Sequence, residues 1–355
     1  MRSDFGSLLE QAGFDASERG FWQRVIMIDN RVLLPATRLE EGDLMKLHGF
    51  NALILDRNGV PTHFCKCRPP TKDWIRQTEF CTRISMEPSL RHVLPPTRAV
   101  GSMDLHMAIS EYVPGRAFEP RVRWMRTGKL DAAIQEILLL METIALRGVI
   151  VDPEVFAGQT RIDLAAEAAW AFDTIPPSLF APSQAAVVRN AISAAGSVRR
   201  VLQHGDLWPR NILRYDGHWW LLDFDTFGRI QVPLYDVFHM VRSCWVLRQG
   251  RGVTRWNLRR ARLQSPSPSW VKDLRWSSTM ETSKTTLKWA RDRQGLTNVE
   301  AIGALAFYLI DTVARMCRRQ HPMQYVEPYL SDLGILAECL SAGETFACAF
   351  GDAAS

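Results

Sequence analysis

The chain has 355 residues, of which 46% are hydrophobic and 23% charged. At roughly 100–200 residues per domain, this length predicts two or three units with sizeable cores and excludes global disorder. Forty-three basic residues against 38 acidic ones give a net charge of +5, a mild excess that favours anionic partners over cationic ones. The sequence has no apolar run of about 18 residues and no signal-peptide core, so we expect a cytoplasmic protein without a transmembrane segment. The odd count of seven cysteines predicts reduced thiols.

The first third of the chain is predicted to be rich in strands. Asn58 and Gly59 separate two β-type runs, residues 51–56 and 62–67, and favour a hairpin turn with positive φ at both positions. A helix is expected from residue 71 or 73 to residue 86, followed by a strand over residues 107–113. This part of the chain is therefore predicted to be a β-dominated unit with one helix.

Beyond Gly115 the pattern becomes helical, and this change predicts a domain boundary. We expect helices over residues 130–146, 164–172, 184–199, 300–318 and 326–340. Arg147 and Gly148 are expected to close the first of these helices. Residues 248–293 are polar and basic with four interspersed tryptophans, which predicts an irregular insertion. The predicted domains are residues 1–115 and 116–355.

A short β-type segment, residues 201–225, interrupts the helical part. Asp216 and Gly217 lie between two apolar runs and predict a second hairpin, in which residue 215 opposes 218 and residue 210 opposes 223. This register makes Asn211 and Asp223 diagonal neighbours at the open end, and Asp206 precedes Asn211 by five residues. Two carboxylates and an amide oxygen that converge in this way suit a hard cation such as Mg²⁺.

The sequence HGDLWPRN at residues 204–211, followed twelve residues later by Asp223, resembles the HGDxxxxN…D signature of the aminoglycoside phosphotransferase and choline kinase superfamily. The HGDLW form is similar to that of fructosamine kinases. This resemblance implies an α+β, two-lobed protein-kinase-like fold with a β-rich N-lobe and a mainly helical C-lobe. It also implies that Asp206 is the catalytic base, that Asn211 and Asp223 bind Mg²⁺, and that Asp236 braces the catalytic loop.

The same resemblance assigns nucleotide-binding residues in the first unit. Lys66 stands where the family has its phosphate-binding lysine, and Glu79 stands where the ion-pair partner of that lysine lies. Residues 109–115 resemble the interlobe hinge, which implies that Glu111 and Val113 bind adenine through their backbone. Strand alternation places Phe64 on the same face as Lys66 and the neighbouring cysteines on the other. No GxGxxG precedes Lys66, and the candidate phosphate-covering loop lies around residues 47–50.

Simpler interpretations stand beside these roles. Lys66 in an edge strand and Glu79 on a helix are also compatible with ordinary solvated positions. Asp225, two residues beyond Asp223, is a candidate second metal or water ligand. The basic runs are compatible with a solvated surface, a nucleic-acid or membrane contact, or an anionic acceptor site, although no spacing typical of a nucleic-acid module is present. They comprise Arg121, Arg123, Arg126, Lys129 and the seven basic residues of 251–275.

The resemblance implies an ATP-dependent phosphotransferase that moves the γ-phosphoryl group to a hydroxyl of a small molecule. Aminoglycosides are polycations and need acidic walls, whereas the segments expected on the acceptor side are basic. A neutral or anionic, sugar-like or glycosylated acceptor is therefore favoured. Two alternatives remain at this point: an aminoglycoside-type antibiotic kinase, and a catalytically silent nucleotide-binding module. The oligomeric state is open.

Overall fold

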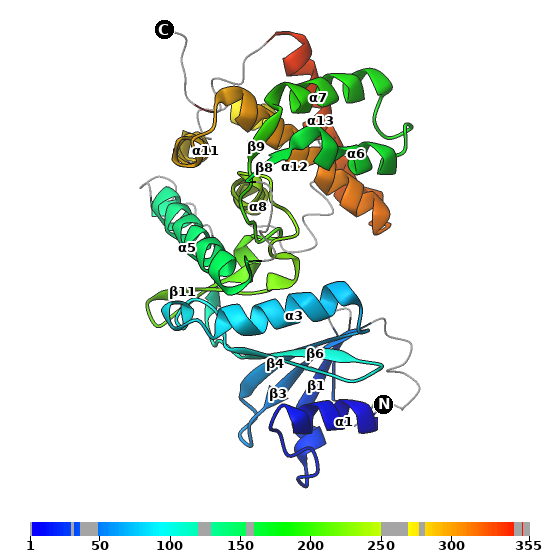
Figure 1. The fold of residues 1–355 in the computed structure, drawn as a ribbon, viewed down its shortest axis with the longest axis vertical. Helices are drawn as coiled ribbons and strands as arrows, with labels where there is room; N and C mark the ends of the chain where they lie inside the picture. The colour runs from blue at the N-terminus through cyan, green and yellow to red at the C-terminus, as the bar shows by residue number, and fades with distance from the viewer. Residues whose placement is uncertain are drawn as a thin grey trace. The chain divides into compact units, whose positions relative to one another are not determined.

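The computed structural model describes residues 2–29, 32–35, 49–119, 129–153, 160–249, 269–276, 281–343 and 350. These residues divide into two compact units (Figure 1). The first unit comprises Met1–Phe118, Leu146–Val155 and Arg210–Phe227, and the second comprises Glu119–Ala145, Phe156–Pro209 and Gly228–Ser355. The first unit therefore includes the second hairpin. The predicted domain boundary at residue 115 instead places this hairpin in the C-terminal domain. One unit is built on a sheet and the other mainly on helices, which confirms the predicted α+β class.

A six-stranded antiparallel sheet with the order β2-β1-β3-β4-β6-β5 forms the first unit. Its strands are β1 (Val25–Asp29), β2 (Val32–Pro35), β3 (Phe50–Leu55), β4 (Pro61–Arg68), β5 (Thr97–Gly101) and β6 (His106–Glu111). Around them lie α1 (Arg2–Gln11), η1 (Phe21–Arg24), α3 (Lys72–Ser85) and η3 (Pro88–Leu90). Helices α1 and α3 lie on opposite faces of the sheet (Figure 1).

One face of β4 packs into the core of the first unit, and the other face points away from this core. Cys65 and Cys67 are fully buried in a core that includes Phe5 and Leu8 of α1. Because successive strand residues point to opposite faces, as predicted, Lys66 faces the other way. The alternation of β4 thus directs one long cationic side chain away from the core.

The hairpin between β3 and β4 exists, but its predicted two-residue turn is wrong. Only Gly59 has a positive φ, of 80°, and the strands are joined by residues 56–60. The Asp56 carboxylate accepts hydrogen bonds from the backbone N–H groups of Asn58 and Val60, both at 2.8 Å. This side-chain cap stabilises a longer loop, which explains why the dipeptide signal failed.

The second hairpin matches its prediction. β10 (Ile212–Tyr215) and β11 (His218–Leu221) pair from Tyr215–His218 to Ile212–Leu221, and Asp216 and Gly217 occupy the turn with φ of 47° and 76°. β7 (Arg116–Ala117) adds a third strand on β10. The 3₁₀ turns η5 (Pro209–Asn211) and η6 (Phe224–Thr226) adjoin the open end of the hairpin.

The second unit contains most of the remaining elements. These are α5 (Lys129–Val151), whose last turns belong to the first unit, β8 (Arg161–Asp163), α6 (Leu164–Thr174), α7 (Pro182–Ala195), β9 (Ser197–Arg199), α8 (Tyr235–Gln249), α10 (Trp270–Trp276), α11 (Glu281–Gln294), α12 (Asn298–Arg318) and α13 (Met323–Ser341). Among the described residues, no single helix is long and apolar enough to cross a membrane, although the bent pair Ser283–Gln294 and Asn298–Arg318 passes by length and composition.

Three expectations about the helical part are corrected. α5 does not close at Gly148 but continues to Val151. α7 ends at Ala195, because residues 197–199 form β9 and pair with β8. Within the predicted irregular insertion, residues 270–276 and 281–294 are helical. Residues 250–268 and 277–280 of that insertion lie outside the described residues.

A buried ion pair links three helices of the second unit. Arg242 on α8 donates through Nε to Oδ2 of Asp332 on α13 at 3.0 Å, and both side chains are at most 5% exposed. Oδ1 of Asp332 accepts from the hydroxyl of Ser269 at 2.8 Å and from the backbone N–H of Val271 at 3.2 Å. The guanidinium also lies 3.5 Å from the ring centroid of Tyr329. Both oxygens of the Asp332 carboxylate therefore accept hydrogen bonds, and Arg242 balances its charge.

Removing one partner of this pair leaves a buried charge without compensation. We expect Asp332→Ala to lower the free energy of unfolding by about 3–5 kcal/mol. Glu338→Ala, at an exposed position of the same helix, is the matched control and should change it by less than about 0.5 kcal/mol. Urea denaturation followed by circular dichroism measures both; equal effects of the two variants would contradict the assigned role.

Candidate active site

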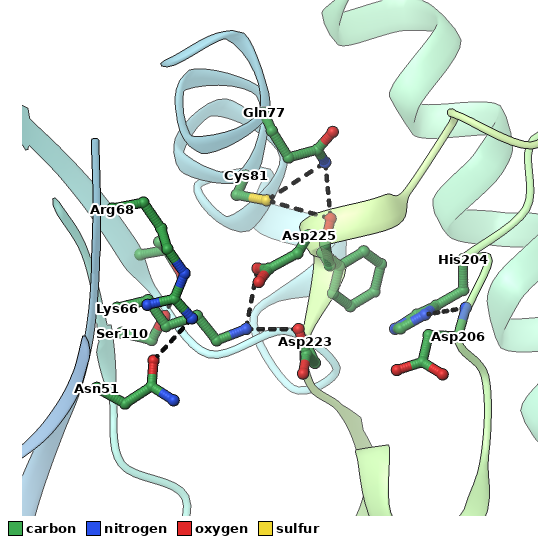
Figure 2. Close-up of polar contacts among 12 residues, drawn as sticks. Asn51, Lys66, Arg68, Gln77, Cys81, Ser110, His204, Asp206, Asp223 and Asp225 are labelled. Atoms are coloured by element: carbon green, nitrogen blue, oxygen red, sulfur yellow. Dashed lines mark hydrogen bonds and ion pairs between the residues drawn. The ribbon is translucent and has the colours of Figure 1, made fainter. Parts of the chain in front are cut away.

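One lysine and two aspartates form the polar centre of the first unit (Figure 2). Lys66 donates through Nζ to Oδ1 of Asp223 at 2.5 Å and to Oδ1 of Asp225 at 2.9 Å. The lysine side chain is 14% exposed, and the two aspartates are 40% and 34% exposed. The sequence positions of these residues differ by more than 150, so the strand pairing of β4 and the end of the second hairpin together create the contact.

The hairpin explains why Asp223 reaches this position. The backbone N–H of Leu222 donates to the carbonyl of Asn211 at 2.8 Å, which continues the β10–β11 register by one step. Asp223 then adopts φ 64° and ψ 55°, and η6 begins at the next residue. A non-glycine residue in the left-handed region costs about 1 kcal/mol or more and is enriched at functional sites. The strand end and this turn place two carboxylates on one side of Lys66.

The charges of this cluster influence one another. Burial raises the pKa of Asp225, and the nearby Asp223 raises it further, whereas Lys66 opposes both effects. Burial alone would lower the pKa of Lys66, but Asp225 and Asp223 outweigh it, so the pKa of the ammonium is raised. Lys66 therefore remains charged at neutral pH, and one positive charge faces two acidic groups.

The expected contact between Lys66 and Glu79 does not form. Glu79 is exposed on α3, and no ion pair joins it to Lys66 among the described residues. Glu79 instead acts electrostatically on His106. Burial lowers the pKa of His106, and the negative charge of Glu79 partly opposes this shift. The physical reason is the helix phase, because α3 turns Gln77 and Cys81 towards η6.

Gln77 and Cys81 fix α3 to the turn that carries the two aspartates. The amide of Gln77 donates to the carbonyl of Phe224 at 2.6 Å, and Sγ of Cys81 lies 3.9 Å from the same oxygen (Figure 2). The rings of Phe80 and Phe227 stack with centroids 5.2 Å apart. Gln77 is not among the residues predicted from the sequence; its spacing of four residues from Cys81, which places both on one helix face, was the available signal.

A cavity of about 400 Å³ lies beside this cluster, lined entirely by residues of the first unit. Its lining includes Phe64, Lys66, Glu111, Val113, Asn211, Asp223 and Asp225, so seven of the residues singled out from the sequence line one cavity. The backbone N–H groups of Glu111 and Tyr112 donate to the carbonyls of Pro96 and Thr62, at 3.0 and 2.8 Å. Within the described residues, the backbone N–H of Val113 has no partner. Of the expected phosphate-covering loop, residues 47 and 48 lie outside the described residues.

The second unit holds the loop that carries Asp206. Asp236, at the start of α8, is 3% exposed and accepts from the backbone N–H groups of His204 at 2.5 Å and Gly205 at 2.9 Å. Burial raises the pKa of Asp236, against the opposing effects of His204 and these two N–H groups. The backbone N–H of Asp206 in turn donates to Nδ1 of His204 at 3.4 Å (Figure 2). Asp236 thus holds the loop by the contacts expected of a brace.

His239 is a neighbour of Asp206 that sequence analysis missed. Its Nε2 lies 3.4 Å from Oδ1 of Asp206, and its Nδ1 lies 3.3 Å from the hydroxyl of Tyr308 on α12. Residues 236 and 239 are one helical turn apart, so both face the loop. That spacing was a usable signal once Asp236 had been placed against the loop.

The sequence profile described as the phosphotransferase enzyme family matches residues 90–274, more than half of the chain. The chain therefore belongs to this family, which confirms the predicted family resemblance and the phosphotransferase class. A comparison with curated protein sequences found no match.

Several solved structures resemble the chain at low identity. A thermostable mutant of aminoglycoside phosphotransferase APH(4)-Ia, in complex with AMP-PNP and hygromycin B, is 12% identical over 86% of this chain and 93% of that chain, with a TM-score of 0.48. A choline/ethanolamine kinase family protein from Mesorhizobium loti is 11% identical over 99% and 100%, with a TM-score of 0.45. Macrolide 2'-phosphotransferase MphH from Brachybacterium faecium is 14% identical over 93% and 97%, with a TM-score of 0.44. The family assignment rests on the sequence match.

The brace of the Asp206 loop is testable by an isosteric change. Asp236→Asn replaces one acceptor oxygen with an NH₂ group that faces a backbone N–H, so one buried donor loses its partner. We expect a loss of about 1–3 kcal/mol in the free energy of unfolding and faster amide hydrogen exchange at residues 204 and 205. Asp173→Asn, at an exposed position of α6, is the control. Unchanged exchange at both amides would show that Asp236 does not hold the loop.

Proposed function

We propose that this chain is an ATP-dependent phosphotransferase that moves the γ-phosphoryl group onto a hydroxyl of a small molecule, with the site residues acting as set out below. The observation that carries the proposal is the cluster of Lys66, Asp223 and Asp225 at the edge of a 400 Å³ cavity. Phosphoryl transfer needs little covalent chemistry from a protein and depends on positioning and charge neutralisation. Lys66 and the two adjacent carboxylates, Asp223 and Asp225, supply both requirements.

The lining of the cavity suits a nucleotide. The backbone N–H of Val113, which has no partner among the described residues, offers a hydrogen bond to an adenine edge beside Glu111 of the same segment, and Phe64 offers an apolar surface to the ring. The ammonium of Lys66 is suited to pair with phosphate oxygens as a compact charge. The volume lies within the usual range for ligand sites of about 300–1,000 Å³.

The residues beside Lys66 fit a magnesium ion. Two carboxylates against one ammonium favour a further cation, and carboxylate and amide oxygens are ligands that Mg²⁺ prefers. Asp223 and Asn211, adjacent at the open end of the hairpin, would hold the ion, and water and phosphate oxygens would complete its ligands. When bound, the ion neutralises charge that develops on the phosphate oxygens. The backbone strain at Asp223 agrees with a functional role.

Asp206 is the group assigned to the acceptor hydroxyl. Its carboxylate orients the hydroxyl and accepts its proton as the bond to phosphorus forms. Asp236 fixes the loop through two backbone N–H groups, and His239 lies against the carboxylate itself. Together these contacts limit the number of orientations that Asp206 adopts, which is the main contribution of a positioned base.

The acceptor is proposed to be a neutral or anionic, sugar-like or glycosylated small molecule. Support comes from the net charge of +5 and from basic runs in the sequence, most of which lie outside the described residues, at 121–126 and 251–262. An excess of positive charge repels a polycation such as an aminoglycoside. A screen of hydroxyl-bearing metabolites and aminoglycosides, read as acceptor-dependent ADP release, tests this. ADP release with aminoglycosides alone would reverse the choice, and no release with any acceptor would favour a silent nucleotide-binding module.

Asp206→Asn tests the catalytic base. The amide keeps the size of the side chain but cannot accept the hydroxyl proton. We expect turnover to fall by about 10²–10⁴-fold while the Kd for ATP stays within about twofold of the parent. Turnover follows from ADP release and the Kd from calorimetry. Turnover close to that of the parent would remove Asp206 from the proposed role.

Asp223→Asn tests the metal site without disturbing the turn, because asparagine tolerates the left-handed conformation at φ 64°. The loss of a charged ligand should raise the Mg²⁺ concentration for half-maximal activity by about tenfold or more, and excess Mg²⁺ should restore turnover only in part. Asp216→Asn is the matched control, since Asp216 also has a positive φ but lies in the exposed hairpin turn. An identical Mg²⁺ dependence in both variants would place the metal elsewhere.

A further inference from the structure

We propose that Asp225 is the residue that positions Lys66 for the nucleotide, and that Glu79 has no part in holding it. This inference deepens the proposed function and rests on it. It assigns the lysine anchor to the turn η6, beside the metal ligand Asp223, rather than to helix α3. The carboxylate that the family resemblance assigns to this task is therefore replaced by one from another element.

The contacts of Lys66 carry the first step. Its Nζ lies 2.9 Å from Oδ1 of Asp225, a distance typical of a charge-assisted hydrogen bond, and the lysine is 14% exposed. Its other contact, with Asp223 at 2.5 Å, involves the carboxylate proposed to bind Mg²⁺. A cation on Asp223 competes with the ammonium for that carboxylate, because both seek the same negative charge. Asp225 then remains as the partner that keeps Lys66 in place.

The phase of α3 excludes Glu79 from this role. With 3.6 residues per turn, residues 77 and 81 lie on one face, and residue 79 lies roughly 200° away from each. Gln77 and Cys81 already contact the carbonyl of Phe224, at 2.6 and 3.9 Å. Glu79 would reach Lys66 only if α3 rotated about its axis, which would break these contacts and the stacking of Phe80 on Phe227. Helix α3 therefore directs Gln77 and Cys81, and not Glu79, towards η6.

This arrangement has a functional consequence. When the lysine partner sits on a movable helix, helix position controls whether the phosphate-binding lysine is in place. Here the anchor and the metal ligand are two residues apart on one turn, and α3 is tied to the same turn by an uncharged hydrogen bond. Nucleotide binding consequently does not depend on an ion pair made by α3.

Isosteric variants separate the two carboxylates. Asp225→Asn should raise the Kd for ATP by about 10- to 100-fold, as expected for the loss of a hydrogen bond to a charged group. Glu79→Gln, the matched control, should leave the Kd within twofold. Calorimetry with ATP in EDTA and again with Mg²⁺ distinguishes this role from metal binding. Loss of Asp225 should weaken ATP binding in EDTA, where Asp223 still contacts Lys66, and weaken it more with Mg²⁺, where Asp225 alone holds the lysine. Loss of a metal ligand should have no effect in EDTA. Asp225→Glu should restore part of the affinity.

A second measurement needs no nucleotide. In double-mutant cycles on the full chain, Lys66→Met and Asp225→Asn should be non-additive by about 2- to 150-fold in the unfolding equilibrium constant, whereas Lys66→Met and Glu79→Gln should be additive. Additivity in the first cycle, or a larger ATP effect from Glu79→Gln, would overturn the inference. So would an effect of Asp225→Asn seen only with Mg²⁺. A parent protein that binds no ATP would refute the proposed function instead, and a non-additive first cycle would still identify the Lys66–Asp225 pair.

Discussion

The shared ammonium of Lys66 is the interaction on which the first unit's site depends. Two carboxylates from one turn approach a single lysine from β4, at 2.5 and 2.9 Å. Removing a lysine from water is costly unless opposite charge compensates it, and here two carboxylates contact the ammonium. The second carboxylate makes the cluster receptive to a cation, and the charged ammonium of Lys66 makes it receptive to phosphate. Both properties arise because β4 and the turn after β11 bring these three side chains into contact.

Two simple periodicities explain what could be predicted of this geometry. The alternation of β4 directs Cys65 and Cys67 into the core and Lys66 away from it. The turn at Asp216 and Gly217 sets the register of β10 and β11, which brings Asn211 beside the end of β11. Both rules act over a few residues and involve backbone geometry alone, so they do not depend on contacts with the rest of the chain. The grouping of Asp223 with Lys66 then required only the family resemblance as a guide.

Other features depended on contacts between distant segments and could not be predicted locally. Glu79 was assigned from its order along the chain, but the phase of α3 is set by packing of Gln77 and Phe80 against η6 and Phe227. The Asn58–Gly59 turn was overridden by the carboxylate of Asp56. Gly148 was expected to end α5, yet a glycine inside a helix costs only about 1 kcal/mol, which packing readily exceeds.

In both units, aspartate carboxylates fix a segment of the site by accepting hydrogen bonds, although the groups that they fix differ. In the second unit a buried carboxylate, Asp236, holds the Asp206 loop through two backbone N–H groups; in the first, Asp223 and Asp225 hold Lys66. Each arrangement desolvates a charge and then compensates it with directional donors, so few alternative geometries are low in energy. Phosphoryl transfer gains most from such preorganisation, because charges already aimed at the reacting oxygens need no reorganisation when charge develops. Asp236 is a buried carboxylate of this kind, and its two hydrogen bonds fix the loop of Asp206, the group proposed to accept the hydroxyl proton.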